Sequence, residues 1–182
     1  RTISMIQETP WPSGNTFYNG CNVSLSGIVT ADTAQYNSVY SAYALQDGTG
    51  QWNGMIFDTD EIVHLTRGDD VSITGLITES AIGDEFGYQL DGNTRLINAS
   101  VTINSSGNEA PAPLVTSCED LHQIADEVES YEGVLVKLNN VTVSAVNQYD
   151  WAITDASGFE ALIDDDMACL LYTSDAADER NS

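Results

Sequence analysis

The sequence predicts an all-β protein: one small closed barrel of five strands, a short helix, and a truncated second copy of the barrel. Three observations lead to this prediction. Two segments alternate apolar and small hydroxyl residues around a central glycine, two short strands flank an Asp-Gly turn, and one pattern occurs twice. The 182 residues, 42% of them hydrophobic, are enough for one or two compact domains.

The strands of the first barrel are predicted within residues 1–104. In two of them an apolar side chain stands at every second position, and Gly27 or Gly75 lies where a strand of a small barrel has to bend. Asp47 and Gly48 supply the turn of a hairpin. Strands are predicted at residues 23–30, 42–46, 54–58 and 71–78. A further pairing of residues 86–90 with residues 94–103, turned at residues 91–93, follows them.

A linker and a helix are predicted after the barrel. Residues 105–116 are polar and then proline-spaced, which predicts a linker. Ser117 has the character of an N-cap, with acids in the first turn behind it. A helix of about 12 residues is therefore predicted, with one apolar face and a stop before Gly133. The residues of that face are Leu121, Ile124 and Val128, and strand patterns resume at residues 134–138 and 141–143.

An internal repeat supports a second module in residues 117–168. Residues 44–50 match residues 152–158, at an offset of 108 residues, and each copy is followed by a short apolar strand. An aspartate recurs at the same place in both copies, with a glycine three residues later. We expect a geometric role in which the carboxylate accepts backbone N–H bonds within the turn, with ligand binding as the alternative. The four residues are Asp47, Gly50, Asp155 and Gly158.

Both ends of the chain look artificial. The sequence opens at Arg1 in what already reads as folded-domain sequence, so we expect a cut start. Residues 169–182 resemble a translated sequencing-adapter read, so we expect them not to belong to the fold; the alternative is a genuine polar tail.

Two cysteines, Cys21 and Cys118, remain once that tail is excluded. They fit either one long-range disulfide of a secreted protein or two buried free thiols. Neither has a second cysteine or a histidine at metal-site spacing, so a zinc site is not expected.

Three segments in the expected order carry a family resemblance: residues 24–30, residues 45–57 and residues 67–75. They resemble OB-fold modules of secreted bacterial nucleases and multidomain surface proteins, and the likeness covers about residues 2–166. The resemblance implies an OB-like barrel and a secreted or cell-surface location. It implies no catalytic residue, because the matching motifs are structural.

No catalytic motif is visible in the sequence. Nucleophile elbows, phosphate-binding loops, dinucleotide-binding glycine patterns and zinc-protease motifs are all missing. His64 and His122 are the two histidines, and both fit surface or cap positions better than a general base. We therefore expect that this chain is not an enzyme.

Nucleic-acid binding would need aromatic side chains for base stacking and cations for phosphates. The net charge of −23, from 28 acidic and 5 basic residues, opposes it, and no apolar run is long enough for a membrane helix. The alternative for the aromatics is packing within the barrel. The candidates are Tyr36, Tyr40, Tyr43, Trp52 and Phe57 for stacking, with Arg67 and Arg95 for phosphates.

Calcium is the one cofactor that the acids suggest. Asp58, Asp60 and Glu61 offer hard oxygen ligands close together, without the glycine and distal glutamate of a helix-loop-helix calcium site. Solvated turns are the favoured explanation of these acids.

The function predicted from these observations is a non-catalytic accessory module of a larger secreted bacterial protein. Its covalently linked partner would be an extracellular nuclease or phosphoesterase domain. One alternative is a module that binds single-stranded nucleic acid or polysaccharide. The other is a structural spacer of a cell-surface protein, rigidified by calcium.

Overall fold

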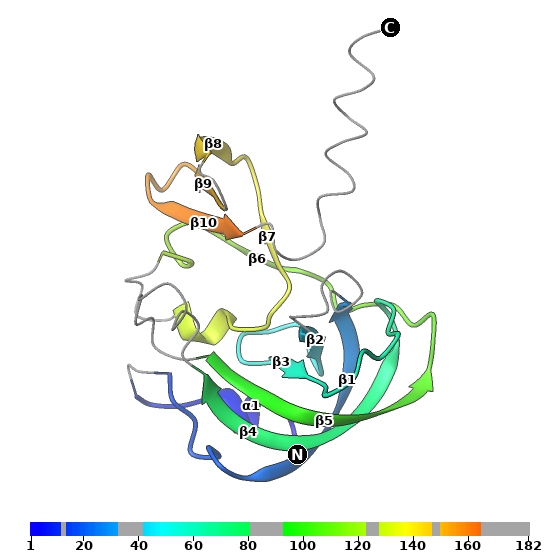
Figure 1. Cartoon of the computed structure of the whole chain (residues 1–182). Helices are drawn as coiled ribbons and strands as arrows, with labels where there is room; N and C mark the ends of the chain where they lie inside the picture. Colours follow the sequence, from blue (N-terminus) through cyan, green and yellow to red (C-terminus); the bar gives the residue numbers. More distant parts are fainter. Residues whose placement is uncertain (12–13, 33–41, 81–92, 123–127, 147–149, 165–182) are drawn as a thin grey trace, which may run out of the picture.

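A computed structural model describes residues 1–11, 14–32, 42–80, 93–122, 128–146 and 150–164. Strands dominate these residues, and a closed barrel lies below a small three-stranded sheet in Figure 1. The elements are α1 (Ser4–Gln7), β1 (Asn22–Ala31), β2 (Ala42–Gln46), β3 (Gly54–Asp58), β4 (Asp70–Ser80), β5 (Asn93–Ser105), β6 (Leu114–Thr116), the 3-10 helix η2 (Val128–Tyr131), β7 (Val136–Leu138), β8 (Thr142–Val146), β9 (Asp150–Thr154) and β10 (Glu160–Asp164).

The barrel has the strand order β1-β2-β3-β5-β4, and β4 returns to pair with β1. All neighbouring strands are antiparallel except β3 and β5, which pair in parallel at Ile56 with Arg95 and Phe57 with Leu96. The prediction of an all-β protein with a closed five-stranded barrel is confirmed. The predicted hairpin is also confirmed, since β2 and β3 pair over residues 42–46 and 54–58.

Glycines let neighbouring strands approach in the curved parts of the barrel. A Cβ on Gly27 would lie 2.6 Å from Leu45 Cδ1, and one on Gly75 would lie 2.3 Å from Leu96 Cδ2. Gly75 also falls where the register of β4 against β5 shifts, between Thr74 and Leu76. A side chain at either glycine would therefore press on the strand beside it.

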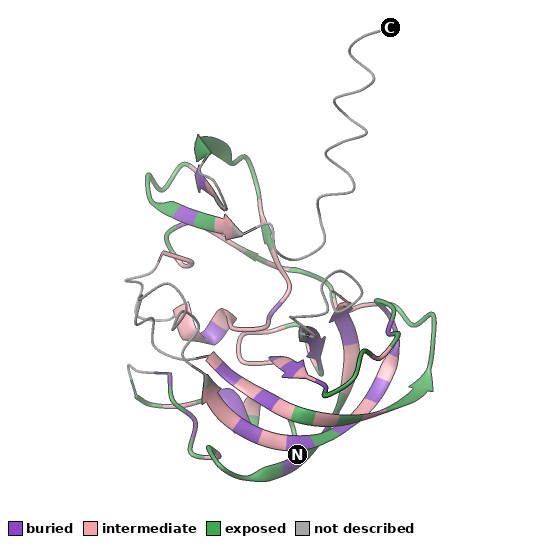
Figure 2. Ribbon diagram, in the orientation of Figure 1, coloured by how far each residue is buried: buried purple, intermediate pink, exposed green. Residues whose placement is uncertain are grey.

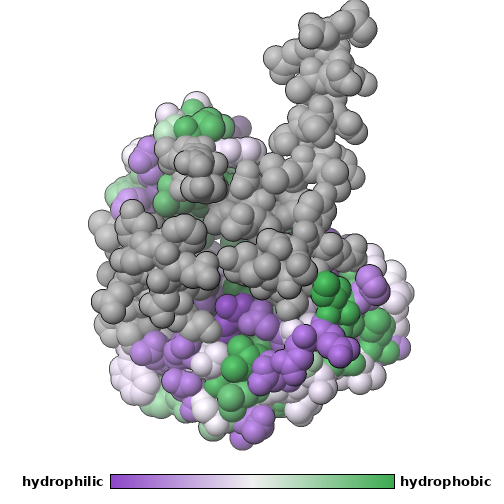
Figure 3. Space-filling view, viewed as in Figure 1, coloured by the Kyte–Doolittle hydropathy of each residue, from purple (hydrophilic) through white to green (hydrophobic). Residues whose placement is uncertain are grey.

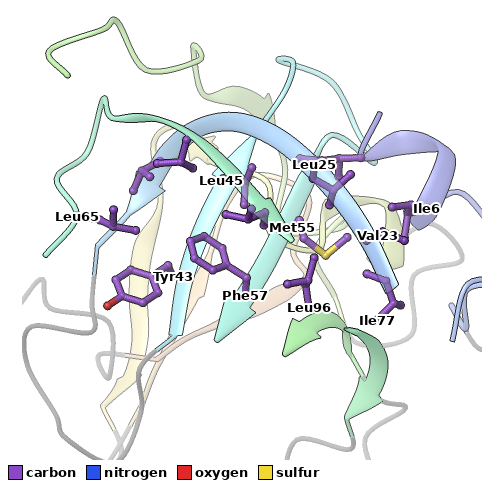
Figure 4. Packing of buried hydrophobic residues seen from close by; sticks show 14 residues of the cluster. Ile6, Val23, Leu25, Tyr43, Leu45, Met55, Phe57, Leu65, Ile77 and Leu96 are labelled. Atoms are coloured by element: carbon purple, nitrogen blue, oxygen red, sulfur yellow. The ribbon is translucent and has the colours of Figure 1, made fainter. Parts of the chain in front are cut away.

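The barrel interior is filled by side chains from every strand. Buried and exposed positions alternate along the strands in Figure 2, and Figure 4 shows the buried side chains converging. Tyr43 and Phe57 stack with their ring centroids 5.1 Å apart. The core consists of Ile3, Ile6, Val23, Leu25, Val29, Tyr43, Leu45, Met55, Phe57, Leu65, Val71, Ile73, Ile77 and Leu96.

Helix α1 closes one end of the barrel, and the sequence analysis missed it. Ile3 and Ile6 are buried within the barrel core. The Gln7 side chain donates to the Gly54 carbonyl at 2.9 Å, which fixes the helix to the start of β3. At four residues, α1 is too short for helical periodicity to reveal it.

The predicted helix after Ser117 does not extend through the described residues. Residues 118–122 form turns, η2 follows at Val128–Tyr131, and residues 123–127 lie outside the described residues. The predicted linker contains β6, which pairs in parallel with β7. The predicted strand at 86–90, residues 91–92 of its turn and the tail at 169–182 also lie outside the described residues. Asn93, the last residue of that predicted turn, begins β5, which pairs with β4.

Strands β8, β9 and β10 form a separate antiparallel sheet in the order β10-β9-β8. Its small core joins Cys118 and Leu121 to Ile153, Ala161 and Ile163. None of the helices within the described residues is long and apolar enough to cross a membrane.

Candidate functional site

Two of the predicted stacking residues belong to the barrel interior. Tyr43 and Phe57 are both fully buried. The Tyr43 hydroxyl donates to the Val63 carbonyl at 2.7 Å and accepts from the Val63 N–H at 2.9 Å. A nucleic-acid base could reach neither ring without opening the barrel, so Tyr43 and Phe57 take the packing role that was the alternative to base stacking.

Trp52 lies in the turn between β2 and β3 and is half-buried. Its backbone adopts a left-handed φ of 65°, and its N–H donates to the Ser130 carbonyl at 2.7 Å. The turn therefore contacts a later part of the chain through its backbone. The other predicted stacking residues, Tyr36 and Tyr40, lie outside the described residues.

The two predicted phosphate-binding cations, Arg67 and Arg95, have different surroundings in the structure. Arg95 on β5 forms an ion pair with Asp58 on β3, with 2.6 Å between Nη2 and Oδ1. This pair lies across the parallel strands that close the barrel, so Arg95 is engaged in the fold. Arg67 is exposed in the turn before β4.

The predicted calcium ligands do not gather into a site. Asp58 is committed to Arg95, and burial raises the pKa of its carboxyl even though the guanidinium lowers it. Asp60 and Glu61 are exposed beside it. Among the described residues, no group of three or more histidine, cysteine, aspartate or glutamate side chains is placed to hold a metal ion.

A shallow groove of about 400 Å³ runs over the outside of β1 and the turn after β2. Three of its lining residues are acidic, and none of the ten is basic or aromatic. This lining repels phosphate groups and offers no base-stacking surface. The lining residues are Ser26, Gly27, Ile28, Gln46, Asp47, Gly48, Thr49, Asp70, Glu109 and Pro111.

The outer face of β2 and β3 is covered by residues 128–135, which we call the connector. The Leu135 N–H donates to Gln46 Oε1 at 2.7 Å, and Gln46 is buried. A Cβ on Gly54 would lie 2.2 Å from the Gly133 carbonyl carbon, so the two backbones are in close contact. The connector therefore occupies part of the surface that an open barrel face would present to a ligand.

Glu132 fastens the connector to the start of β5. Its Oε2 accepts from the Thr94 N–H at 3.2 Å. Burial, followed by the nearby charges of Glu129 and Glu79, raises the pKa of Glu132 to about 8, against the lowering effect of the Thr94 N–H and the Gln7 side chain. A carboxyl group at this position is therefore largely protonated at neutral pH.

The recurring aspartates tie each hairpin to an earlier segment. Asp47 Oδ2 accepts from the Ile3 N–H at 2.7 Å, 44 residues away. Asp155 Oδ2 accepts from the Cys118 N–H at 2.9 Å, and its Oδ1 accepts from Ser157 within the turn. Hydrogen bonds from Ser157 and Cys118 lower the pKa of Asp155.

The recurring glycines are not equivalent in the structure. Gly158 has φ +81° and stands two residues before β10. The residue two positions before β3 is Trp52, which has the matching left-handed backbone, whereas Gly50 is not among the residues with positive φ. The turn between β2 and β3 contains two more residues than the turn between β9 and β10. The left-handed position that Gly158 occupies in the later turn therefore falls on Trp52 in the first turn and not on Gly50.

Two further features occur in both parts of the chain. The register of β1 against β2 shifts after Val29, opposite Leu45, and that of β8 against β9 shifts after Val143, opposite Ile153. In each case one extra residue forms a bulge.

A turn of the type Tyr-x-Gly precedes β1 in the barrel, and another precedes β7 in the later segment. Cys21 N–H donates to the Tyr18 carbonyl at 2.9 Å and Val134 N–H donates to the Tyr131 carbonyl at 3.0 Å. Gly20 and Gly133 both have a positive φ, so the two turns share their backbone geometry. The repeated Tyr-x-Gly was the sequence signal that could have located the connector.

Both described cysteines are free thiols, so the structure contains the free-thiol alternative and no Cys21–Cys118 disulfide. Cys21 is exposed, whereas Cys118 is buried against Ile153. Desolvation, followed by the Asp155 charge, raises the pKa of the Cys118 thiol, which makes it a poor nucleophile. His64 is exposed, and His122 packs edge-on against Phe159.

The fold and this geometry define the class of the molecule: an all-β protein built on a closed five-stranded barrel. No family model matches this chain, and no curated protein matches it either.

Proposed function

We propose that this chain is a non-catalytic accessory module of the OB type, within a larger secreted bacterial protein that carries an extracellular nuclease or phosphoesterase domain. The observation that carries the proposal is the way the barrel closes, with β3 parallel to β5 and β4 returning to β1. This strand arrangement is that of OB barrels. The nature of the parent protein rests on the sequence resemblance over residues 2–166.

An accessory role fits the surfaces better than ligand binding does. The barrel interior is filled by buried side chains from all five strands. Its β2–β3 face carries the connector, and the groove beside that face contains three acidic residues and no basic one. These features support a module that positions neighbouring parts of a protein.

Retention on immobilised single-stranded DNA tests the role. At about 50 mM salt we expect the full chain to flow through, because its acidic surface repels phosphates. Incubation with DNA and a phosphodiester substrate in the presence of Mg²⁺ or Ca²⁺ should release no product. Salt-dependent retention that Arg67→Glu abolishes, or any metal-dependent hydrolysis, would replace the accessory role with a binding or catalytic one.

A second candidate function is polysaccharide binding, and the groove is the observation that favours it. Its carboxylate and hydroxyl groups can bond sugar hydroxyls, whereas the carboxylates repel phosphates. Affinity electrophoresis in gels containing neutral polysaccharides tests this candidate. Retardation by one polysaccharide that Glu109→Gln, at an exposed lining residue, weakens would support it, and unchanged mobility in all gels would remove it.

We also propose that residues 114–164 are a second copy of the first part of the barrel. Four matched features support this: the hairpin register, the bulge in the preceding strand, the Tyr-x-Gly turn, and the aspartate that binds an earlier backbone N–H. In this correspondence β8, β9 and β10 are the counterparts of β1, β2 and β3.

A further inference from the structure

The inner face of the β8–β9–β10 sheet is incompletely covered. Val143 lies opposite Ile153 and Val146 lies opposite Trp151, and residues directly opposite each other share a face of a sheet. Ile153 is buried, yet Val143 is 52% and Val146 is 72% exposed. Figure 3 shows hydrophobic side chains at this tip of the molecule, over the position of β8.

The first barrel shows what covers the equivalent face. Val29, the counterpart of Val143, is 0% exposed because β4 and β5 complete the barrel around it. There β4 pairs antiparallel with β1, and β5 pairs parallel with β3. In the described residues, the outer edges of β8 and β10 pair with no strand.

We propose that the β8–β9–β10 sheet is a docking site for an antiparallel β-hairpin with the properties of β4–β5. One strand of the hairpin would pair antiparallel with β8, and the other would pair in parallel with β10. Its inward residues would be aliphatic at every second position, as Val71, Ile73 and Ile77 are. This inference rests on the proposed second copy.

The register also predicts a charged residue on the partner. In the first barrel, Arg95 of β5 is paired with Ile56 of β3 and forms an ion pair with Asp58, two residues after Ile56. Asp164 occupies the register position of Asp58, since each ends its hairpin at the last strand pair. The hairpin strand beside β10 should therefore carry arginine or lysine at the position of Arg95.

The structure favours a hairpin over a second copy of the chain as the occupant. Two copies would bring two molecules of net charge −23 together, and their repulsion opposes such a contact. A hairpin supplies both missing strands at once and leaves no edge open. Its cation would also meet an acidic protein.

The test uses the full chain and a labelled peptide of residues 69–105, with hydrogen exchange and fluorescence anisotropy as readouts. About 300 mM NaCl screens the repulsion between the chain and this peptide, which has six acidic residues and one arginine. At about 100 µM peptide we expect saturable binding and roughly tenfold slower exchange of amides in residues 142–164, with the first barrel unchanged. Val143→Glu and Val146→Glu should each abolish both effects. Since both side chains are exposed, these variants should keep the fold. An Arg95→Glu peptide should bind more weakly.

Four outcomes would overturn the docking site: no binding, protection confined to the first barrel, equal binding by the Val143→Glu variant, or concentration-dependent self-association of the chain that Val143→Glu removes. The last result would identify a second copy as the occupant. These outcomes are distinguishable from failure of the accessory role, because DNA retention or hydrolysis is measured without the peptide. The hydrogen-exchange rate of the Cys118 amide in the Asp155→Ala variant tests the proposed second copy separately, because Asp155 is the counterpart of Asp47.

Discussion

The side-chain carboxyl group of Glu132 joins the connector to the barrel. Its Oε2 accepts from the Thr94 backbone, while Glu129 and Glu79 add negative charge nearby. Within the described residues, its buried Oε1 has no hydrogen-bond partner. Ionisation is therefore unfavourable in the folded state, which links the stability of the connector to pH.

The substitution Glu132→Gln should remove part of the pH dependence of stability. The folded-state pKa of about 8 lies above the usual value of 4.5, so the stability from the protonated group is complete below 4.5 and is lost as the pH rises to about 8. At about pH 9 we expect Glu132→Gln to raise the free energy of unfolding by about 2 kcal/mol, with little change near pH 4. Urea unfolding at both pH values measures this.

The control for that measurement is Glu61→Gln, which removes one charge from an exposed side chain. It should shift stability by less than about 0.5 kcal/mol at either pH. Equal behaviour of the two variants would mean that Glu132 is solvated.

A second residue-scale prediction concerns Asp47, which binds the Ile3 backbone and so holds α1 at the barrel end. Asp47→Ala should lower the free energy of unfolding by about 1 kcal/mol. Asp47→Ala should also accelerate hydrogen exchange of the Ile3 amide, and Asp155→Ala should accelerate that of the Cys118 amide, because each loses its carboxylate acceptor. Asp60→Ala, at an exposed position, is the control in chemical denaturation. An unchanged exchange rate of the Ile3 amide would contradict the role of Asp47, and an unchanged rate of the Cys118 amide would contradict that of Asp155.

At the scale of elements, the connector depends on a close approach between two glycines. Gly54 begins β3, and Gly133 has a positive φ of 65°. The backbones are so close that neither residue has space for a Cβ. The connector and the barrel therefore pack as one unit, although they are far apart in the sequence.

The substitution Gly54→Ala should displace the connector, because the new Cβ would meet backbone atoms of Gly133 and Val134 that cannot rotate away. We expect a loss of about 2 kcal/mol in stability and faster exchange of the Leu135 amide. Gly50→Ala is the matched control, since its nearest neighbour is the Asn53 side-chain amide at 3.1 Å. Slow Leu135 exchange in Gly54→Ala would contradict this packing.

At the scale of the whole molecule, the dominant property is the charge. With 28 acidic residues against 5 basic ones, the chain repels itself in the compact state. The one ion pair among the described residues, Asp58 with Arg95, offsets little of that repulsion. Screening by salt should therefore stabilise the fold.

Raising NaCl from about 10 mM to about 300 mM should increase the melting temperature by a few degrees. Differential scanning calorimetry at constant pH measures the shift. Sucrose at matched osmolality is the control, because it does not screen charge. A melting temperature that falls or stays constant with salt would show that repulsion does not limit stability.

The strands of the barrel could be predicted from the sequence because their signals are local. Alternation of apolar residues and the Asp-Gly turn fix the hairpin of β2 and β3 within neighbouring residues. The direction of the aromatic side chains was missed: Tyr43 and Phe57 are in phase with buried Leu45 and Met55, so they point inward. The sequence also missed α1, whose single turn carries no periodicity.

The sequence by itself determined the strands, the hairpin and the acidity, since each depends on composition or on residues close along the chain. Tertiary structure decided that Arg95 pairs with Asp58, that Asp47 binds the Ile3 backbone, and that Glu132 of the connector binds the Thr94 backbone. Each of these contacts joins residues more than 30 positions apart, and only closure of the barrel and docking of the connector bring them together.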